Sequence, residues 1–364
     1  MAVSAVHDQV LRHAIREHPD DGHEAATYAW LTREVARLMQ LPFERDAADG
    51  DRGFYVPDDT LTAAQAARLG LRGACDLLGG VVPYAFVATK VITHPLVDAH
   101  AAAPQGWQHA LGGALVDATV PGYAAFARED ALQAYARLCV GGQVRLKLPT
   151  GVGGMGQRLL DDGKALYEAL DALGPDYLAQ HGVVLERHLE RPVTFSVGQV
   201  DCAGLTIAYY GTQTTTRDRD GRQAYGGSNL FVIRGTLDDL LAGELAPDHR
   251  QAVTKARVYD QFISRAYPDF YASRRNYDVI EGFDRDGIRL SGVLEQSWRI
   301  GGATPAELAA VEAFLRDPAL RTVAACTREF HDDRPAPADA QVYYRGEDAR
   351  AGHLLKYRQV LGTG

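Results

Sequence analysis

The stretch that most constrains the fold runs from Gln143 to Gln157, with the sequence QVRLKLPTGVGGMGQ. Its first half alternates apolar residues with Arg145 and Lys147, which is the period of a strand with one buried face. Lys147 lies on the polar face at the strand's end. The loop that follows is rich in glycine, at Gly151, Gly153, Gly154 and Gly156. Backbone N–H groups of such a loop can turn toward a bound anion.

Two interpretations of this stretch stay open on its residues alone. In the first, the lysine at the end of the strand and the glycine-rich loop together bind a polyphosphate. In the second, the loop is a glycine-rich turn and the lysine is an ordinary surface residue. The loop is not a P-loop, because no Gly-Lys-Ser/Thr closes it, and its GxGGxG pattern is not the dinucleotide fingerprint.

Composition excludes several classes of protein. A length of 364 residues predicts two or three domains. A net charge of −9 argues against a general nucleic-acid or anionic-membrane binder. No apolar run is long enough to span a bilayer, and the first residues lack the pattern of a secretory signal. The scattered cysteines indicate a reducing cytoplasm rather than zinc ligands or disulfides, and they are Cys75, Cys139, Cys202 and Cys326.

The order of elements suggests α/β architecture with four parts. A first α/β domain covers residues 1–120 and ends in a polar segment rich in alanine, glycine and proline. Helices are expected near 25–41, 129–139, 161–173 and 252–267. The capping candidates for a further helix that ends at Leu69 are Asp59, Thr60 and Thr62. Two strands flank a connector at Glu190–Pro192, and a later strand leads into a polar loop with the sequence YGGSN. The remaining divisions, 121–190, 191–310 and 311–364, rest on the family resemblance given below. The last is expected as a strand (341–344) and loops packed on the body.

A second informative stretch covers residues 277–295. Asp286-Gly287 is a strong signal for a two-residue hairpin turn, and that turn places Asp278 directly opposite Glu295. Carboxylates that face each other across a sheet destabilise it, so a divalent cation between them is an economical compensation. In the alternative, a wider loop shifts the register and leaves both acids diagonal and solvated.

Two flanking segments complete this pattern. The apolar run 79–96 delivers Lys90, which either reaches a phosphate or extends into solvent in the usual way. Arg299 follows the hairpin and would point toward the same place. Beyond it, Thr304 and Glu307 form an expected capping box with proline at the first helical position.

With these motifs in this order, the chain resembles the ATP-grasp superfamily. It is also closely similar, over nearly its whole length, to a proteobacterial domain family of unknown function that has this architecture. The stretches that carry the second resemblance include VRLKLPTGVGGMGQ, LERHLERPVTFSVGQV and GVLEQSWRIGG. The resemblance implies an ATP-grasp fold, α+β in the ATP-binding part, with 121–190 as a small lid subdomain and 191–310 as a C-terminal mixed-sheet subdomain.

The resemblance also implies roles for individual residues. Those expected at the ATP phosphates are Lys90, Lys147, Gly151, Gly153, Gly154 and Gly156. Those expected around adenine and ribose are Glu186, which would accept from the adenine amino group, the backbone at Arg187 and Leu189, and Glu190. Those expected at Mg²⁺ are Asp278, Glu295 and Ser297. Arg299 and Lys147 would act on the transferring phosphoryl group.

The sequence departs from the superfamily pattern at two positions. Ser297 stands where the superfamily usually has asparagine, and serine is a weaker metal ligand. The acid expected to bind ribose near Val193–Thr194 is missing, and Glu190 is its nearest substitute.

Three hypotheses about function follow. The first is an ATP- and Mg²⁺-dependent carbon–nitrogen ligase that activates a carboxylate as an acyl phosphate for attack by an amine or another nucleophile. The others are a phosphotransferase and a non-catalytic nucleotide-binding protein. Candidates for clamping the substrate carboxylate are Arg217, Arg274 and Arg275, although each alone fits a solvated surface. The sequence leaves open whether two copies of the chain form a homodimer.

Overall fold

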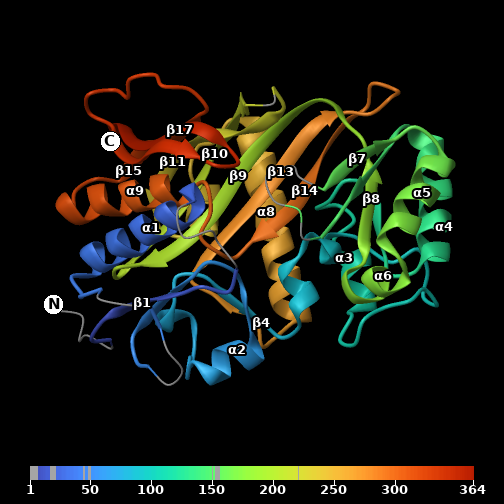
Figure 1. The fold of residues 1–364 in the computed structure, drawn as a ribbon, viewed down its shortest axis with the longest axis horizontal. Helices are drawn as coiled ribbons and strands as arrows, with labels where there is room; N and C mark the ends of the chain where they lie inside the picture. Colours follow the sequence, from blue (N-terminus) through green and yellow to red (C-terminus); the bar gives the residue numbers. More distant parts are fainter. Residues whose placement is uncertain are drawn as a thin grey trace.

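The computed structural model describes residues 7–16, 22–43, 46–47, 51–149, 151, 156–219 and 221–364. Figure 1 shows a large sheet crossing the molecule, a small sheet with its own helices at one side, and an N-terminal part below. No described helix has both the length and the apolar character needed to cross a membrane. The cysteines are free thiols, and burial is complete only for Cys202 and Cys326, whereas Cys75 is exposed.

The body is an eight-stranded sheet in which neighbouring strands are antiparallel. In spatial order the strands are β14 (Arg289–Ser297), β13 (Arg274–Phe283), β9 (Glu190–Cys202), β10 (Leu205–Arg217), β11 (Gln223–Arg234), β15 (Thr322–Phe330), β17 (Gly352–Thr363) and β16 (Gln341–Asp348).

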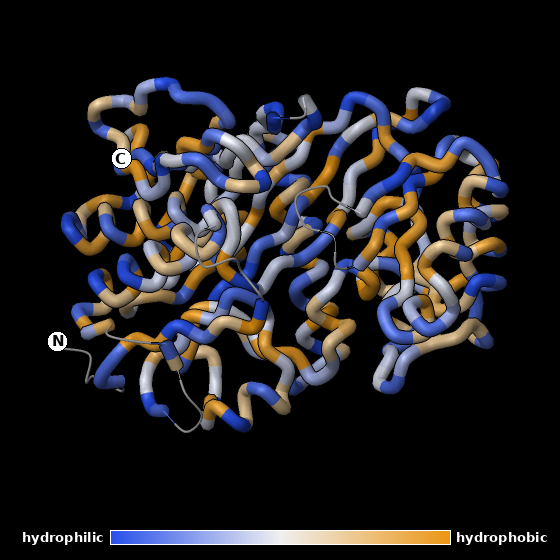
Figure 2. The backbone as a smooth tube through the Cα atoms, viewed as in Figure 1, coloured by the Kyte–Doolittle hydropathy of each residue, from blue (hydrophilic) through white to orange (hydrophobic). Residues whose placement is uncertain are grey.

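Helices cover both faces of this sheet because its strands carry apolar side chains on alternate sides. One face packs on α1 (His23–Met39) and α9 (Thr304–Arg316) through residues such as Tyr209. The other packs on α8 (Pro247–Ala266), which follows α7 (Leu237–Ala242), through residues such as Tyr277. Figure 2 shows hydrophobic residues recurring along these strands and on the helices beside them. Two strands of this sheet, β13 and β14, carry the predicted metal ligands Asp278 and Glu295.

A separate four-stranded antiparallel sheet lies at one side of the body (Figure 1). Its spatial order is β5 (Gly122–Ala125), β8 (Val183–Arg187), β6 (Val144–Lys147) and β7 (Gln157–Leu160). Its apolar face packs on α4 (Arg128–Leu138), α5 (Gly163–Leu173) and α6 (Pro175–His181). Asp162 caps α5, because its Oδ1 accepts from the backbone N–H of Ala165 at 2.8 Å.

The N-terminal part is small and mixed. β1 (Val10–His13) runs parallel to β2 (Phe54–Pro57), and a second sheet has the order β12 (Tyr271–Ala272), β4 (Gly80–Val82) and β3 (Leu61–Thr62). Thr62 and Gln65 form a capping box at α2 (Ala63–Arg68), so Thr62 is the cap among the three predicted candidates. The remaining elements are α3 (His109–Ala114) and the 3₁₀ turns η1 (Ala74–Asp76), η2 (Ala85–Ala88), η3 (Lys90–Thr93) and η4 (Cys139–Gly141).

Three local expectations are wrong. The YGGSN segment is not a loop but part of β11. The last residues are not mainly loops, because β16 and β17 extend the large sheet. Thr304 and Glu307 form no capping box: the N-cap of α9 is Ala303, and the Thr304 hydroxyl accepts from the N–H of Gly301 at 2.9 Å. Glu307 is instead buried in the core.

Candidate functional site

Lys147 lies on strand β6, as the alternation predicted, but the polar face of the strand is buried there rather than exposed to solvent. The Lys147 ammonium pairs with Oε1 of Glu186 on β8, and the side chains are only 3% and 4% exposed. The register aligns Arg145 with Glu186 and Lys147 with Val184, so the two charged side chains project from the same face of adjacent strands. Lys147 is therefore half of a buried ion pair and not a solvated lysine.

His94 completes this pair, and the sequence analysis did not identify it. Its Nε2 lies 3.3 Å from Oε2 of Glu186, and its side chain is 1% exposed. Burial alone would raise the pKa of Glu186, but the charge of Lys147 and the contact with His94 lower it to about 2. The carboxylate therefore stays ionised across the physiological range. A His-Pro pair after an apolar run carries no distinctive spacing that would have identified His94.

Lys90 joins the glycine-rich loop to the hairpin. Its Nζ lies 2.5 Å from Oε2 of Glu295 and donates to the carbonyl of Gly151 at 2.9 Å. The lysine is the first residue of η3 and is buried. The structure thus brings Lys90, Glu295 and one end of the loop together at hydrogen-bonding distance, although they are far apart in the sequence.

Only part of the glycine-rich loop is described. Leu148 donates its N–H to the carbonyl of Gly156 at 2.8 Å, and Gly151 donates to the carbonyl of Leu148 at 3.2 Å. Gly156 has a φ of +69°, a conformation that favours glycine. Two of the loop glycines expected at the phosphates, Gly153 and Gly154, lie outside the described residues.

Asp278 and Glu295 are directly opposed on β13 and β14, as predicted. The predicted two-residue turn is wrong, because the loop between the strands spans residues 284–288 and shifts the register by one. An irregularity between Asp278 and Val279 restores the pairing, with Leu294 as the extra residue on β14. The two acids therefore face each other because of a β-bulge and not because of the turn.

Polar neighbours fix the Asp278 carboxylate. Its Oδ1 accepts from Nε2 of Gln213 at 2.7 Å and from Nδ2 of Asn276 at 3.0 Å. Burial, together with the negative charge of Glu295, raises the pKa of Asp278 to about 6. Two converging carboxylates suit a hard cation. Among the described residues no group of three or more His, Cys, Asp or Glu gathers as a ready-made cage, so a cation there would need phosphate or water oxygens as well.

The raised pKa of Asp278 predicts an unusual pH dependence for the metal-free protein. The folded state binds the proton more tightly than the unfolded state, so the stability from this group is lost as pH rises through about 6. Asp278→Asn should therefore remove a gain on the order of 1–3 kcal/mol that the parent shows as pH falls from about 7 to about 4. Urea melts with a chelator at several pH values measure the difference. Parallel pH curves for parent and variant would contradict it.

Arg299 lies beyond the hairpin, where the large sheet meets the N-terminal part. Burial, together with the nearby charge of Arg16, lowers the pKa of the Arg299 guanidinium. Its Nη1 donates to the carbonyl of Ile300 at 2.7 Å, and no carboxylate of the described residues forms an ion pair with it. Arg16 pairs with Asp59 through a 2.7 Å contact. Ser297 lies opposite Asn276, at the end of the same hairpin.

Of the three arginines proposed to clamp a carboxylate, Arg274 is excluded by its position. It is fully buried and forms a bidentate pair with Glu307 at 2.7 and 2.8 Å. Tyr209 links Glu307 to Asn276, through contacts of 2.6 and 2.8 Å, and Asn276 reaches Asp278. This buried network positions the Asp278 carboxylate through Asn276. Because Arg274 is enclosed in the network, it has no access to a ligand.

The other two arginines also have protein partners. Nε of Arg275 lies 3.2 Å from Asp260, and Arg217 donates to the carbonyl of Gly221 at 2.8 Å. Arg217 lies at the exposed end of β10, whereas Arg275 points to the α8 side of the sheet with Asp260.

The predicted connector at Glu190–Pro192 is wrong, because these residues begin β9. The connector between β8 and β9 consists of His188 and Leu189. The N–H of Arg187 donates to Pro121 and that of His188 to Gln143, both at 2.9 Å. Leu189 is buried, whereas Glu190 is the exposed first residue of β9. The end of β8 and the connector are thus bonded to the segments that lead into β5 and β6, the two neighbours of β8.

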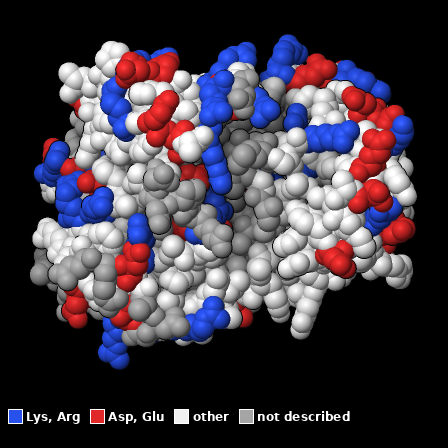
Figure 3. All heavy atoms as spheres, viewed as in Figure 1, with Lys and Arg blue, Asp and Glu red and all other residues white. Residues whose placement is uncertain are grey.

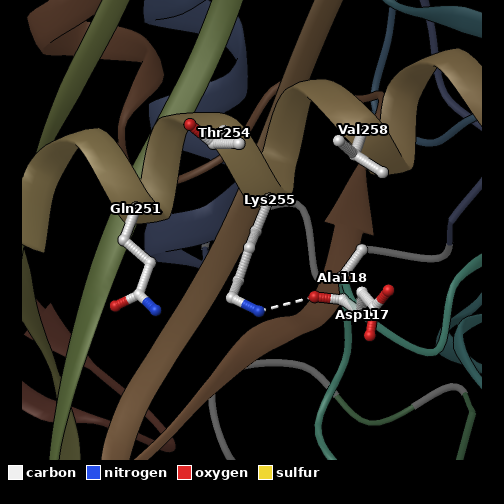
Figure 4. A pocket seen from close by; sticks show the side chains of 6 residues that line it. All are labelled: Asp117, Ala118, Gln251, Thr254, Lys255 and Val258. Atoms are coloured by element: carbon white, nitrogen blue, oxygen red, sulfur yellow. Dashed lines mark hydrogen bonds between the residues drawn. The ribbon is translucent and has the colours of Figure 1, made fainter.

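Figure 3 shows a hollow near the middle of this face of the molecule, with lysine and arginine side chains at its margin. A different hollow of about 270 Å³ lies on the α8 side, between that helix and the segment Asp117–Ala118. Figure 4 shows Lys255 reaching from α8 to the carbonyl of Asp117, at 2.6 Å. This second hollow contains none of the predicted site residues.

Several solved structures are similar to this chain. N5-carboxyaminoimidazole synthase from Aspergillus clavatus superposes with a TM-score of 0.51 at 11% identity, over 97% of this chain and 94% of that chain. Biotin carboxylase from Campylobacter jejuni gives 0.48 at 11% identity, over 83% and 71%. The biotin carboxylase domain from Hydrogenobacter thermophilus gives 0.45 at 17% identity, over 69% of this chain and only 60% of that chain.

No curated protein matches the sequence. At such low identity the structural likeness concerns the fold alone, and it is the likeness to ATP-grasp enzymes. The family model described as "Protein of unknown function (DUF3182)" matches residues 10–358. The chain belongs to that family, and its fold is the α+β ATP-grasp fold.

Proposed function

We propose that this protein is an ATP- and Mg²⁺-dependent ligase that activates a carboxylate as an acyl phosphate for attack by an amine or another nucleophile. One observation carries the proposal: Lys90 contacts both Glu295 and the Gly151 carbonyl. A cation for phosphate, one end of an anion-binding loop and a candidate metal ligand therefore meet at one point. The Aspergillus clavatus synthase was solved with ADP and 5-aminoimidazole ribonucleotide, which is consistent with such chemistry on this fold.

The chain's own residues would act mainly by neutralising and positioning charge. Lys90, Lys147 and the loop 151–156 would hold the phosphates, and the backbone at Arg187 and Leu189 would line the adenine. Arg299 would stabilise the phosphoryl group during its transfer to the substrate carboxylate, since no carboxylate of the described residues forms an ion pair with it. Phosphoryl transfer needs no protein nucleophile, so these residues suffice.

Asp278 and Glu295 fit a magnesium ion by their chemistry, because two carboxylates converge from opposed strand positions. Asp278 and Glu295 would hold the ion, whose positive charge would offset the charge of the nucleotide phosphates. Lys90 would then have to leave Glu295 and turn to the phosphates, as its expected role requires. Free thiols at all four cysteines suit a reducing compartment such as the cytoplasm.

A non-catalytic nucleotide-binding protein is the second candidate. Ser297, in the position where a stronger metal ligand is expected, favours it. The two candidates differ in turnover and not in nucleotide binding.

ATP with Mg²⁺ is expected to stabilise the protein, because only the folded chain assembles Lys90, Lys147 and the hairpin acids. A concentration 100 times the dissociation constant should add roughly 2.7 kcal/mol to the free energy of unfolding. A thermal-shift titration measures this, with ATP plus a chelator as the control for the metal. No shift for a folded protein at millimolar ATP–Mg²⁺ would contradict the proposed function.

A further inference from the structure

The two oxygens of the Asp278 carboxylate have different surroundings. Oδ1 accepts from Nε2 of Gln213 at 2.7 Å and from Nδ2 of Asn276 at 3.0 Å, whereas no described residue donates a hydrogen bond to Oδ2. An ionised carboxylate has about four lone-pair sites, two on each oxygen. The two amide donors therefore occupy the sites of Oδ1, and Oδ2 is the oxygen left for a cation.

Gln213 reaches this carboxylate from a strand that is not its neighbour. Gln213 lies on β10 and Asp278 on β13, with β9 between them in the sheet. The positions in register with Asp278 on β9 and β10 are Ser196 and Gly211, and both residues are small. Neighbouring strands lie about 4.8 Å apart, so a side chain that crosses a whole strand has to be long. The contact with Asp278 thus depends on the length of the glutamine as well as on its amide.

Asn276 is held in place by hydroxyl groups on its other side. Its Oδ1 accepts from the hydroxyl of Ser196 at 2.7 Å, and the hydroxyl of Tyr209 lies 2.8 Å from it. The same Tyr209 hydroxyl lies 2.6 Å from Glu307, and Ser196, Tyr209 and Glu307 are all buried. With its oxygen turned to the hydroxyls, the Asn276 amide has to present Nδ2 to Asp278. The donor on this side of the carboxylate is therefore fixed out of reach of water.

We propose that Gln213 and Asn276 are positioning residues that hold Oδ1 of Asp278 and leave its Oδ2 for a divalent cation shared with Glu295. The register that sets Asp278 opposite Glu295 brings the two carboxylates together on adjacent strands. The proposal rests on the proposed function, since it concerns the metal of the same site. A purely structural role for Gln213 would affect the stability of the protein and not its dependence on the metal.

ATP affinity with and without Mg²⁺ provides the test. Dissociation constants for ATP are measured by calorimetry with Mg²⁺ and with a chelator, in the parent and in Gln213→Met, which keeps a long side chain but has no N–H donor. Because the binding of ATP and of Mg²⁺ is coupled, a loss of metal affinity weakens ATP binding when Mg²⁺ is present. Gln213→Met should weaken ATP about 10-fold with Mg²⁺, a loss usual when a partner that orients a metal ligand is removed, and leave the constant with chelator unchanged.

Two further variants separate positioning from general damage. Gln213→Asn keeps the amide but is too short to cross β9, so it should show the same metal-dependent loss as Gln213→Met. Thr214→Val is the matched control, because Thr214 is the next residue on β10 and its hydroxyl donates to the carbonyl of Gly227 at 3.3 Å, away from Asp278. It should leave both dissociation constants at the parent values.

The outcomes are distinct. Parent-like ATP affinity with Mg²⁺ in Gln213→Met overturns the proposal, and if that variant does not fold, the same result in Gln213→Asn overturns it. An equal loss with Mg²⁺ and with chelator also overturns it, because Gln213 would then contact the nucleotide and not position the metal ligand. A parent that binds ATP under neither condition defeats the proposed function itself, which is a separate result.

Discussion

Lys147→Met is expected to lower the free energy of unfolding by about 3–5 kcal/mol and to weaken ATP binding. Breaking a buried ion pair by removing one partner leaves the other charge buried and uncompensated. Glu186 would keep only the His94 contact on Oε2, while Oε1 would lose its cation. Urea denaturation measures the stability loss, and calorimetry with ATP–Mg²⁺ measures the affinity.

A double variant separates the two effects. Replacing both partners, in Lys147→Met with Glu186→Leu, removes the unpaired charge and should recover much of the stability. It should recover none of the ATP affinity, because the ammonium itself is gone. Lys164→Met is the matched control in the same subdomain, since Lys164 is 83% exposed and only loosely paired with Glu168 at 3.6 Å. A Lys147→Met protein as stable as the parent would refute the buried pair.

This expectation differs from what the sequence suggested for Lys147. Alternation along residues 144–148 correctly separated an apolar face from a charged face. It contained no information on what covers the charged face, because Glu186 and His94 arrive from elements far away in the chain. Period-two patterns identify the two sides of a strand, and only tertiary packing decides which sides meet water.

The hairpin shows a correct prediction reached through a wrong turn. Asp286-Gly287 suggested a tight turn, and the acids were paired by counting back from it. The real loop is longer, and the bulge at Leu294 offsets the shift. Bulges have no reliable sequence signature, so two errors of register cancelled here. The predicted Asp278–Glu295 pairing is therefore correct, although the turn from which it was inferred is wrong.

Glu307 and Arg274 were both assigned the wrong role because each was interpreted from its sequence neighbours alone. Thr304 and Glu307 matched a capping box, and Arg274 matched a substrate clamp, because each was judged from its sequence neighbours. The structure joins Arg274 to Glu307 in the core, behind the hairpin. A long-range pair of this kind cannot be recognised in one sequence, since either residue alone fits a surface role. The acids and lysines of the site were found because their order in the chain, and not their contacts, resembles a known superfamily.

Glu295→Gln is expected to abolish turnover, by at least about 100-fold, while ATP binding weakens only in part. Glutamine cannot supply the second carboxylate to Mg²⁺, and transfer depends on charge neutralisation around the phosphates more strongly than binding does. The substitution removes the charge that helps to raise the pKa of Asp278, but it also takes the carboxylate from Lys90. These effects oppose each other, so the melting temperature without metal should change little.

The measurement is release of ADP and phosphate from ATP across a panel of carboxylates and amines. The matched control is Glu281→Gln on the same hairpin, where the carboxylate pairs with Arg289 at 2.7 Å, away from Lys90. That control should keep its turnover. Release that continues unchanged in Glu295→Gln would overturn the metal role of Glu295. Release by neither parent nor variant, with ATP binding intact in both, would favour the non-catalytic nucleotide-binding protein, because in that case the hairpin acids organise a bound nucleotide without transferring its phosphate.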